Sequence, residues 1–516
     1  MTTSQILIIV SIVAYMAIVV GIGVYFSRKN KNSDDFYLGG RSLGPIVTAM
    51  SAEASDMSSW LLMGLPGLAL ISGIADPAWT AIGLAIGTYI NWLIVAKRLR
   101  KYSQEADNAI TIPEFFKNRY RDSSNVLLAL SALVILVFFI PYTASGFSAC
   151  GKLFSSLFNI DYLPAMILSA LVISGYTMLG GFLAASTTDL IQSIVMTVAL
   201  VIVVFYGIDA AGGMDAVISN ASSVEGYLSL TQMGNTATGE VSAYRPLTIL
   251  STMAWGLGYF GMPHILLRFM AIRHEDEVTL ARRIASIWVV ISMSVAIFIG
   301  VIGYSLSLQG TVPRYETTSE AERILIAIAG ILSQEGVALA LIAGVILAGI
   351  LACTMSTADS QLLAASSSVS QNLLVDVVGI KLTGAQKVIA ARLTVVGIAI
   401  VAMVIAWNPD SSVFTIVSFA WAGFGASFGP LMLFSLFWRR TTRLGAICGM
   451  LTGGIAVFVW KYMVRPMGGA WDLYELLPAF LLSCIVIVAV SLATEAPEQE
   501  ILDTFDAVDR KLKEAK

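Results

Sequence analysis

The sequence predicts an all-α, polytopic membrane protein with thirteen transmembrane helices. Of the 516 residues, 57% are hydrophobic and only 13% are charged, which is about half the charged fraction of an ordinary soluble protein. Thirteen apolar stretches approach the length of about 17–25 residues that crosses a bilayer as a helix. Together these observations exclude a water-soluble globule and a disordered chain. The net charge of −3 gives no basic surface for nucleic acid, so none is expected as a partner.

The apolar stretches follow one another along the whole chain. They cover residues 5–27, 46–73, 79–96, 125–150, 163–178, 187–211, 246–270, 285–308, 335–357, 387–407, 413–437, 444–460 and 476–493. The first is followed by the basic residues Arg28, Lys29 and Lys31, whereas a cleaved signal peptide has its basic residues in front. We therefore interpret this stretch as a retained first helix.

The basic residues predict the orientation in the membrane. With the N-terminus outside, the inner loops and the C-terminal tail hold 25 Lys and Arg residues, and the outer side holds the remaining 6 of 31. Cytoplasmic loops of membrane proteins carry the excess of Lys and Arg. The N-terminus is accordingly predicted outside and the C-terminus in the cytoplasm.

Two of the predicted spans contain residues that an ordinary transmembrane helix avoids. Residues 48–60 hold Glu53, Asp56 and several serines, and the stretch from Trp255 to His264 holds three glycines and a proline. Both stretches predict helices that are interrupted near mid-membrane. They occupy matching places if spans two to six and seven to eleven form two five-helix repeats, which is the arrangement that marks a transporter's binding site.

A third polar cluster extends from Cys353 to Gln361 at the end of the ninth span. Its adjacent hydroxyls, on Ser356 and Thr357, are hard oxygen ligands that suit an alkali or alkaline-earth cation and not zinc. The chain has four cysteines, all within apolar stretches and with no close pair. Neither a disulfide framework nor a zinc site is predicted.

An enzyme and a channel fit the sequence less well than a transporter does. Gly425-Ala-Ser-Phe-Gly429 matches the G-x-S-x-G motif of hydrolases, but that motif needs a strand-turn-helix and a histidine partner. Here it lies in an apolar helix, so we do not expect an enzyme. A channel would need a continuous pore lined by rings of carbonyls or charges, and two single, unlike broken helices suit alternating access better.

Several long motifs resemble one family. They are Asp35-Phe-Tyr-Leu-Gly-Gly-Arg-Ser-Leu-Gly-Pro45, Ala54-Ser-Asp-Met-Ser58, Trp60-Leu-Leu-Met-Gly-Leu-Pro-Gly67, Gly180-Gly-Phe-Leu-Ala184, Trp255-Gly-Leu-Gly-Tyr-Phe-Gly261, Pro263-His-Ile-Leu266 and Trp421-Ala-Gly-Phe-Gly425. In this order they resemble the sodium:solute symporters, and among these the bacterial members that carry proline. The resemblance runs over nearly the entire chain.

The resemblance implies a leucine-transporter type core of two inverted five-helix repeats, with one extra N-terminal and two extra C-terminal helices. The expected segments are 1–45 for the first helix and inner loop, 46–211 and 246–437 for the repeats, 212–245 for an outer loop, 438–494 for the last two helices and 495–516 for a cytoplasmic tail. It further implies Na⁺-coupled uptake of L-proline through the lipid bilayer of the bacterial cytoplasmic membrane. We expect the protein to act as a monomer.

The resemblance also implies site residues. Na⁺ would be held by the backbone oxygens of Ala54, Met57 and Cys353 and by the hydroxyls of Ser356 and Thr357. Cys353 stands where the proline carriers have alanine, but it contributes its carbonyl, so the site is expected to tolerate it.

For the substrate, the resemblance implies Ser58, Tyr142, Trp255 and Tyr259, with Asp56 needed for sodium affinity or coupling. The chemistry agrees, because a serine and a half-helix N-terminus suit the carboxylate of proline while aromatic faces suit its ring and cationic nitrogen. Another small solute, such as a sugar, sialic acid, pantothenate or a different amino acid, stays the alternative.

Two acidic residues depart from the members of the family. Glu53 adds a second carboxylate beside Asp56 and is expected either to pair with Arg41 or to face an aqueous vestibule. Asp359, together with Asp189, Ser356 and Ser360, is a candidate second cation site, as in relatives that carry two sodium ions.

Overall fold

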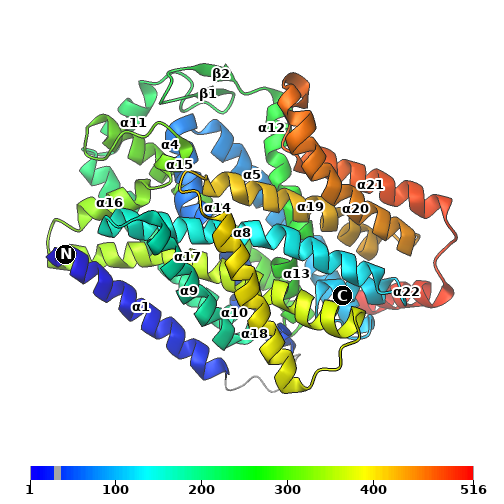
Figure 1. Cartoon of the computed structure of the whole chain (residues 1–516). Coiled ribbons are helices and arrows are strands. Elements are labelled where there is room, and N and C mark those ends of the chain that lie inside the picture. The colour runs from blue at the N-terminus through cyan, green and yellow to red at the C-terminus, as the bar shows by residue number, and fades with distance from the viewer. Residues whose placement is uncertain (1, 28–36, 515–516) are drawn as a thin grey trace.

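Long apolar helices packed side by side form the molecule, which a computed structural model describes for residues 2–27 and 37–514 (Figure 1). The α-helices are α1 (Thr3–Ser27), α3 (Pro45–Asp56), α4 (Leu65–Ser72), α5 (Ala75–Ile90), α6 (Lys97–Glu105), α7 (Ile112–Arg119), α8 (Val126–Phe158), α9 (Tyr162–Gly180), α10 (Phe182–Ala210), α11 (Met214–Ser222), α12 (Pro246–Met253), α13 (Pro263–Ala271), α14 (Val278–Leu308), α15 (Thr318–Ala321), α16 (Ile324–Leu332), α17 (Val337–Ser367), α18 (Gly384–Ile405), α19 (Val413–Phe437), α20 (Arg443–Val459), α21 (Leu476–Ala493) and α22 (Gln499–Glu514). Strands β1 (Gln232–Gly234) and β2 (Val241–Ala243) form an antiparallel hairpin in which Met233 lies opposite Ser242.

Short π and 3₁₀ segments connect or extend these helices. The π segments are η2 (Trp60–Gly64), η3 (Asn91–Ala96), η6 (Ser368–Val377) and η7 (Trp460–Val464), and the 3₁₀ segments are η1 (Gly39–Arg41), η4 (Ala254–Gly261), η5 (Glu275–Glu277), η8 (Arg465–Met467) and η9 (Gly469–Trp471). Such segments commonly mark functional positions in a helix. Two of them, η2 and η4, lie in the spans predicted to be interrupted.

The protein is a multi-pass membrane protein. Within the described residues, nine helices are long and apolar enough to cross a membrane, and the bent pair formed by α3 with η2 and α4 raises the number to ten. The shorter apolar stretches Tyr162–Met178 and Ile389–Ile405 lie in α9 and α18. The window predicted over 246–270 is divided among α12, η4 and α13, which explains why it does not count as one long helix.

Both predicted interruptions are present. Helix α3 ends at Asp56, and Met57 leaves the helical conformation (φ −79°, ψ 68°). The helix resumes at Trp60, and the segment Trp60–Ser72 is bent by 59° from α3. In the other span, η4 ends at Gly261, the next residue Met262 is extended (φ −78°, ψ 109°), and Pro263 begins α13. Proline favours an extended preceding residue and the first position of a helix, so the sequence places this second break.

Glycines allow α5 and η4 to touch through their backbones. A Cβ atom on Gly256 of η4 would lie 2.2 Å from the carbonyl oxygen of Gly83, and one on Gly87 would lie 2.3 Å from the carbonyl oxygen of Gly256. Small residues four apart let membrane helices approach this closely. The close approach fixes the broken helix against α5.

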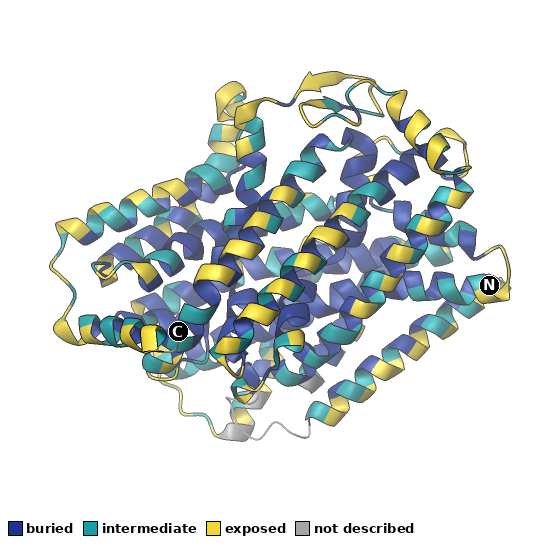
Figure 2. Ribbon diagram, turned by 180° about the vertical axis from the view of Figure 1, so that it is seen from behind, coloured by how far each residue is buried: buried dark blue, intermediate teal, exposed yellow. Residues whose placement is uncertain are grey.

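The exterior of the bundle is apolar over long stretches. Figure 2 shows buried residues filling the centre and exposed residues in stripes along the outward faces of peripheral helices. The stripes include large apolar side chains such as Leu168, Phe205, Leu393 and Ile455. Exposed apolar surface of this extent is typical of a face covered by another apolar phase.

The hairpin and the C-terminal helix lie at opposite ends of one continuous helix. Strand β1 contacts α5, whereas α22 contacts α6, into which α5 continues through η3. In Figure 1 the hairpin stands above the bundle, beside α11 and α12, and α22 lies at the lower right. We call the end that carries the hairpin the hairpin end.

Candidate functional site

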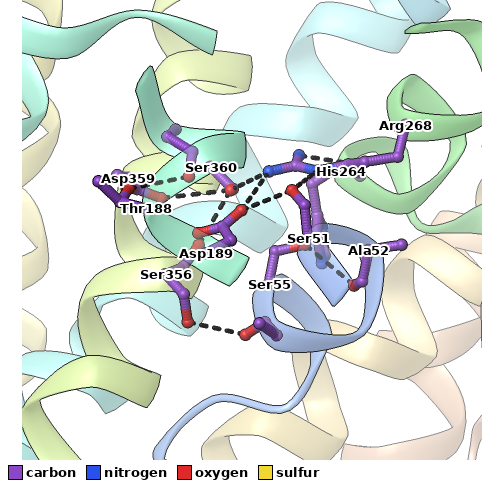
Figure 3. Close-up of polar contacts among 12 residues, drawn as sticks. Ser51, Ala52, Ser55, Thr188, Asp189, His264, Arg268, Ser356, Asp359 and Ser360 are labelled. Atoms are coloured by element: carbon purple, nitrogen blue, oxygen red, sulfur yellow. Dashed lines mark hydrogen bonds and ion pairs between the residues drawn. The ribbon is translucent and has the colours of Figure 1, made fainter. Parts of the chain in front are cut away.

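Helix α17 reaches the broken α3 through two neighbouring hydroxyls. The Ser356 hydroxyl donates to the carbonyl of Ala54 (2.7 Å) and to that of Cys353 (3.1 Å), and the Thr357 hydroxyl donates to the same Cys353 carbonyl (3.1 Å). Figure 3 shows Ser356 extending from its helix toward the end of α3. The structure thus brings together four of the five residues predicted as Na⁺ ligands, and their oxygens form a buried group of hard donors.

The fifth predicted ligand, Met57, stands at the break itself. Its backbone has left the helix, and its thioether sulfur lies 3.7 Å from the hydroxyl of Ser292 on α14. The side chain therefore packs away from α17. Only the main chain of Met57 is free to take part with Ala54.

Asp56 connects the residues predicted to bind substrate. Its carboxylate accepts a hydrogen bond from the Tyr259 hydroxyl (2.5 Å), and its carbonyl accepts from the Tyr142 hydroxyl (3.1 Å) and from Trp60 Nε1 (3.2 Å). Ser58 follows two residues later and accepts from the Trp60 amide at 3.4 Å. Because Ala54 and Asp56 share the last turn of α3, the two predicted sets of residues meet there.

Trp255 neighbours the residues around Asp56 and belongs to an aromatic stack. Its ring packs on Tyr474 (centroids 5.2 Å apart, planes within 20°) and on Phe414 (5.3 Å), and it lies 6.1 Å from Trp60. Its carbonyl accepts a hydrogen bond of 2.7 Å from Trp421 Nε1. Trp60 thus neighbours both the Trp255 ring and the Asp56 carbonyl.

Two cavities are lined by residues that neighbour this group. One, here named the outer cavity, has a volume of about 250 Å³, lies at the hairpin end and has Trp255, Phe414 and Tyr474 among its lining residues. Another, of about 10 Å³, is lined by Arg268 and Ser360. Of the predicted substrate residues, Trp255 lines the outer cavity.

Glu53 neither pairs with Arg41 nor faces an aqueous vestibule. Its carboxylate is buried and accepts a hydrogen bond from Trp92 Nε1 at 3.0 Å. Arg41 instead donates to the carbonyls of Met270 (2.7 Å) and Ala109 (2.8 Å). Both expectations for Glu53 are therefore wrong, because its side chain is buried against Trp92 of η3.

A guanidinium lies beside the residues of the candidate second cation site. Arg268 of α13 donates to Asp189 of α10 (3.2 Å), to the Ser360 hydroxyl of α17 (2.5 Å) and, through Nε, to the Ser51 hydroxyl of α3 (3.0 Å). Ser51 in turn donates to Asp189 at 2.6 Å, and Asp359 accepts from Ser360 at 3.2 Å. Figure 3 shows Arg268 pointing into this cluster, which ties four helices together.

Sequence reasoning missed this role of Arg268. The prediction counted it, at the edge of an apolar window, among the basic residues of an inner loop, but its side chain is only 1% exposed. Lys152, counted on the outer side, is likewise buried, in an ion pair with Glu322 (2.7 Å). The sequence does not show whether a charged residue near the end of a span faces the loop or points inward to a buried partner.

The G-x-S-x-G sequence has a packing role. It lies wholly inside helix α19, and a Cβ atom on Gly425 would come within 2.8 Å of the Cα atom of Gly258 in η4. A nucleophile elbow requires a sharp strand-to-helix turn. The glycines instead let α19 pack closely against the broken helix.

Comparison with known proteins gives matches over nearly the whole chain. The pattern of the Sodium:solute symporter family matches residues 36–453. The sodium/proline symporter of Haemophilus influenzae is 41% identical over 518 residues, covering 99% of each chain. The high-affinity proline transporter of Bacillus subtilis is also 41% identical, over 94% of this chain and 98% of that protein. The sodium/proline symporter of Salmonella typhimurium is 41% identical, over 97% and 96%.

Solved structures share the fold. A substrate-bound, outward-open Na⁺-coupled sialic acid symporter superimposes with a TM-score of 0.77 at 19% identity, covering 96% of this chain and 99% of its own. Mhp1, a nucleobase-cation-symport-1 family transporter in a closed conformation, gives a TM-score of 0.54 at 14% identity, covering 92% and 99%.

Proposed function

The chain belongs to the sodium:solute symporter family, and from this premise we propose that it takes up L-proline together with Na⁺ by alternating access. The observation that carries the proposal is the last turn of α3, where Ala54 meets the hydroxyl of Ser356 and Asp56 meets Tyr142 and Tyr259. The names of the three relatives, each 41% identical, support proline as the solute, and two of these names support Na⁺ as the coupling ion.

Na⁺ binds, in this proposal, to the carbonyls of Ala54, Met57 and Cys353 and the hydroxyls of Ser356 and Thr357. The donor set supports this assignment, since buried carbonyl and hydroxyl oxygens replace the water around a hard cation. Proline binds among Ser58, Tyr142, Trp255 and Tyr259 once Trp60 and its neighbours rearrange. Each of these four side chains belongs to, or contacts, one of the two broken helices.

Na⁺ binding and proline binding are coupled in this proposal because Ala54 and Asp56 share the last turn of α3. Na⁺ bound at Ala54 holds α3 against α17 and orders Asp56, which in turn positions the hydroxyls of Tyr142 and Tyr259. Na⁺ then raises the affinity for proline, and proline raises the affinity for Na⁺ by the same factor, because binding free energies are reciprocally linked.

The membrane arrangement is proposed in the same way. We propose thirteen transmembrane helices, with the two five-helix repeats at 46–211 and 246–437, the N-terminus outside and the C-terminus in the bacterial cytoplasm, and a monomer as the transporting unit. The hairpin end is then the outer end. The split of the basic residues supports this orientation, even with Arg268 and Lys152 withdrawn into the interior.

The driving force is sufficient for accumulation. One positive charge moving inward gains about 2.3 kcal/mol per 100 mV, and a tenfold Na⁺ gradient adds about 1.4 kcal/mol. Their sum, about 3.7 kcal/mol, sustains a proline gradient of roughly several hundredfold at one Na⁺ per proline.

Uptake by the purified protein in liposomes tests the proposal. Labelled proline should accumulate above equilibrium with an inward Na⁺ gradient, and a negative-inside potential should increase it. Trp255→Ala and Tyr259→Ala should raise the KM for proline while the protein still inserts. If a Na⁺ gradient drove no proline uptake, the substrate assignment would fall, and other small solutes would be screened against the same gradient.

We also propose a second cation site at Asp189, Asp359 and Ser360. Two carboxylates face one guanidinium there, and Asp189 Oδ1 and Asp359 Oδ2 have no hydrogen-bond partner among the described residues. These two free carboxylate oxygens and the Ser360 hydroxyl support the assignment, since they are hard donors of the kind that binds alkali cations. Asp359→Ala should remove the cooperativity of Na⁺ activation, and a variant with unchanged cooperativity would rule the site out.

A further inference from the structure

Helix α22 packs on α6 at the end of the molecule opposite the hairpin end (Figure 1). Its buried side chains, Ile501, Phe505 and Val508, recur every three or four residues, which is the pattern of a surface helix with one apolar face. The Phe505 ring meets Tyr102 of α6 edge-on, with centroids 6.2 Å apart. The apolar face therefore docks on α6 as a narrow stripe.

Within the described residues, four ion pairs fasten α22 to three separate segments of the bundle. They are Arg98–Asp509, Lys511–Glu105 (2.6 Å), Arg121–Glu500 (2.9 Å) and Arg439–Asp506 (2.9 Å). Two of the partners belong to α6, one lies between α7 and α8, and one lies between α19 and α20. One short helix thus connects the first proposed repeat with the segment that follows the second.

Two arginines that contact α22 also contact the end of α19. Arg98 of α6 donates through Nε to the Leu436 carbonyl, and its guanidinium lies 5.0 Å from the centre of the Phe505 ring. Arg119 of α7 donates to the Ser435 carbonyl (3.0 Å) and lies 5.4 Å from the same ring centre. Each guanidinium is therefore held between α22 and α19, with an aromatic face that attracts a cation.

The segments that α22 joins hold the broken helix η4 between them. Helix α6 continues α5 through η3, and both α5 and α19 pack on η4. Alternating access moves one repeat against the other around the binding site. A helix that is fastened to both sides at one end of the bundle opposes that movement.

The ion pairs of α22 are exposed enough to respond to salt. The side chains of Arg439 and Asp506 are 48% and 44% exposed, and those of Arg121 and Glu500 are 38% and 65% exposed. Pairs of exposed charges are individually weak. The screening length falls from about 30 Å at low ionic strength to about 8 Å at physiological ionic strength. Salt therefore weakens the attachment of α22.

The linker to α22 is loosely packed. Residues 494–498 join α21 to α22 and line a cavity of about 550 Å³ together with Tyr120 and Thr441 of the bundle. Movement of the linker therefore does not require a packed core to be broken.

We propose that α22 is a strap that keeps the cytoplasmic end of the transporter closed and that rising ionic strength releases it. At low ionic strength the strap holds α6 and the end of α19 together and slows the opening of this end. Salt screens the ion pairs, α22 detaches, and transport becomes faster. The inference rests on the proposed function for its effect on transport and on the geometry of α22 for its release.

The charge of α22 argues against a second resting place on the membrane surface. Residues 499–514 hold five acidic and three basic residues. Helices that lie on membranes are instead rich in Lys and Arg on their polar face. The released strap is therefore expected in water and not on lipid.

Uptake of labelled proline into liposomes tests the strap, at a fixed inward Na⁺ gradient and with equal KCl on both sides. Sucrose keeps the osmolarity constant. The test variant combines Glu500→Gln, Asp506→Asn and Asp509→Asn, which removes the acid from three of the four pairs. Glu514→Gln is the matched control, since Glu514 is an exposed acid of the same helix with no ion pair in the described part of the chain. Thermal unfolding in detergent checks that each variant is folded.

We expect the wild-type Vmax to rise roughly threefold between about 20 mM and about 300 mM KCl. The triple variant should have the higher Vmax already at low KCl and should lose the salt dependence, whereas Glu514→Gln should behave like the wild type.

Hydrogen exchange of the α22 amides reports release without any transport. A helix of sixteen residues is marginal in water when it stands alone, so its amides should exchange faster once it detaches. We expect exchange in α22 to speed up with KCl in the wild type and to be fast at low KCl in the triple variant. Exchange in α8, which the strap does not hold by these pairs, should not change.

The outcomes separate the strap from the transport function. If the wild type accumulates proline but its Vmax ignores KCl, or the triple variant behaves like Glu514→Gln, the strap is overturned and the transport function stands. If the wild type accumulates no proline, the proposed function is overturned. The exchange of α22 then decides the release of the strap: faster exchange at high KCl supports it, and unchanged exchange overturns it.

Discussion

Asp56 uses its main chain and its side chain for different partners. Its carbonyl, at the end of α3, accepts from Tyr142, from Trp60 Nε1 and from the Ser58 amide (2.9 Å), and its carboxylate accepts from Tyr259. A residue inside an intact helix would have its carbonyl occupied by the helix itself. Unwinding after Asp56 is therefore what allows one residue to organise three aromatic side chains beside the proposed ion ligands.

A first prediction at this scale concerns Ser356, whose hydroxyl reaches across to Ala54. Ser356→Ala removes one of five proposed oxygen ligands and should raise the Na⁺ concentration for half-maximal uptake by about tenfold. The measurement is proline uptake as a function of Na⁺. Ser366→Ala is the control, because Ser366 lies on the same helix and donates to Leu363 of its own helix. Equal Na⁺ dependence in the two variants would contradict the ligand assignment.

Among the elements, the contact of α5 with η4 shows how the broken helix is kept in place. The 3₁₀ geometry of η4 leaves a thin segment, and Gly83, Gly87 and Gly256 allow its backbone to lie against α5. Asn91, one turn beyond Gly87, then donates to the Tyr259 carbonyl at 3.0 Å. The glycine contact thereby sets the position of Tyr259 relative to Asp56.

A second prediction follows for Gly256→Ala. The added Cβ atom would overlap the Gly83 carbonyl, and since backbone atoms of both elements must shift, we expect a loss of about 1–3 kcal/mol in the free energy of unfolding. Thermal unfolding in detergent measures the loss, and proline uptake should fall with it. Gly175→Ala on α9 is the control, because nothing lies within 4 Å of its Cβ position. Unchanged stability in Gly256→Ala would show that the contact is not tight.

Across the whole molecule, a buried ion pair joins distant segments at the end that carries the outer cavity. Lys152 of α8 pairs with Glu322, which follows α15, and also donates to the carbonyl of Ser411 (2.9 Å). The other carboxylate oxygen of Glu322 accepts from the Ser412 hydroxyl (2.9 Å) and the Phe414 amide (3.2 Å). This pair therefore holds the start of α19, and with it Phe414, over Trp255.

A third prediction tests this connection with Glu322→Gln. Removing one partner leaves a buried, unbalanced ammonium group, which typically costs about 3–5 kcal/mol. Thermal unfolding should therefore shift strongly downward, and Lys152→Met combined with Glu322→Gln should recover part of the loss. Glu277→Gln, in the exposed pair with Arg273, should have little effect. A Glu322→Gln variant as stable as Glu277→Gln would contradict the proposed role of the pair.

Much of the fold could be predicted because lipid imposes strict local rules. Every backbone group in a bilayer core must be hydrogen-bonded internally, so apolar windows become helices, and each predicted window falls on helical segments. Pro263 and the glycines of η4 place one break in the same local way. The break after Asp56 was predicted from polar residues that a lipid-facing helix would not contain.

The partners of the buried charges could not be predicted. Arg268 was counted as a loop residue and Glu53 was expected beside Arg41, whereas the structure gives Asp189 and Trp92 as their partners. The outer cavity, too, brings Asp76 and Arg465 together from segments almost four hundred residues apart. Nothing local to either residue indicates the other.

By itself, therefore, the sequence determined the helical membrane class, the position of the breaks and the oxygen-rich character of the group near Ala54, Ser356 and Thr357. Those properties follow from the cost of exposing polar groups to lipid, which acts on each segment separately. Only the tertiary structure decided that Tyr142 and Tyr259 converge on Asp56, that Arg268 fills the cluster at Asp189, and that opposite charges line the outer cavity. A buried charge must find a partner wherever packing supplies one, and packing is a property of the assembled bundle.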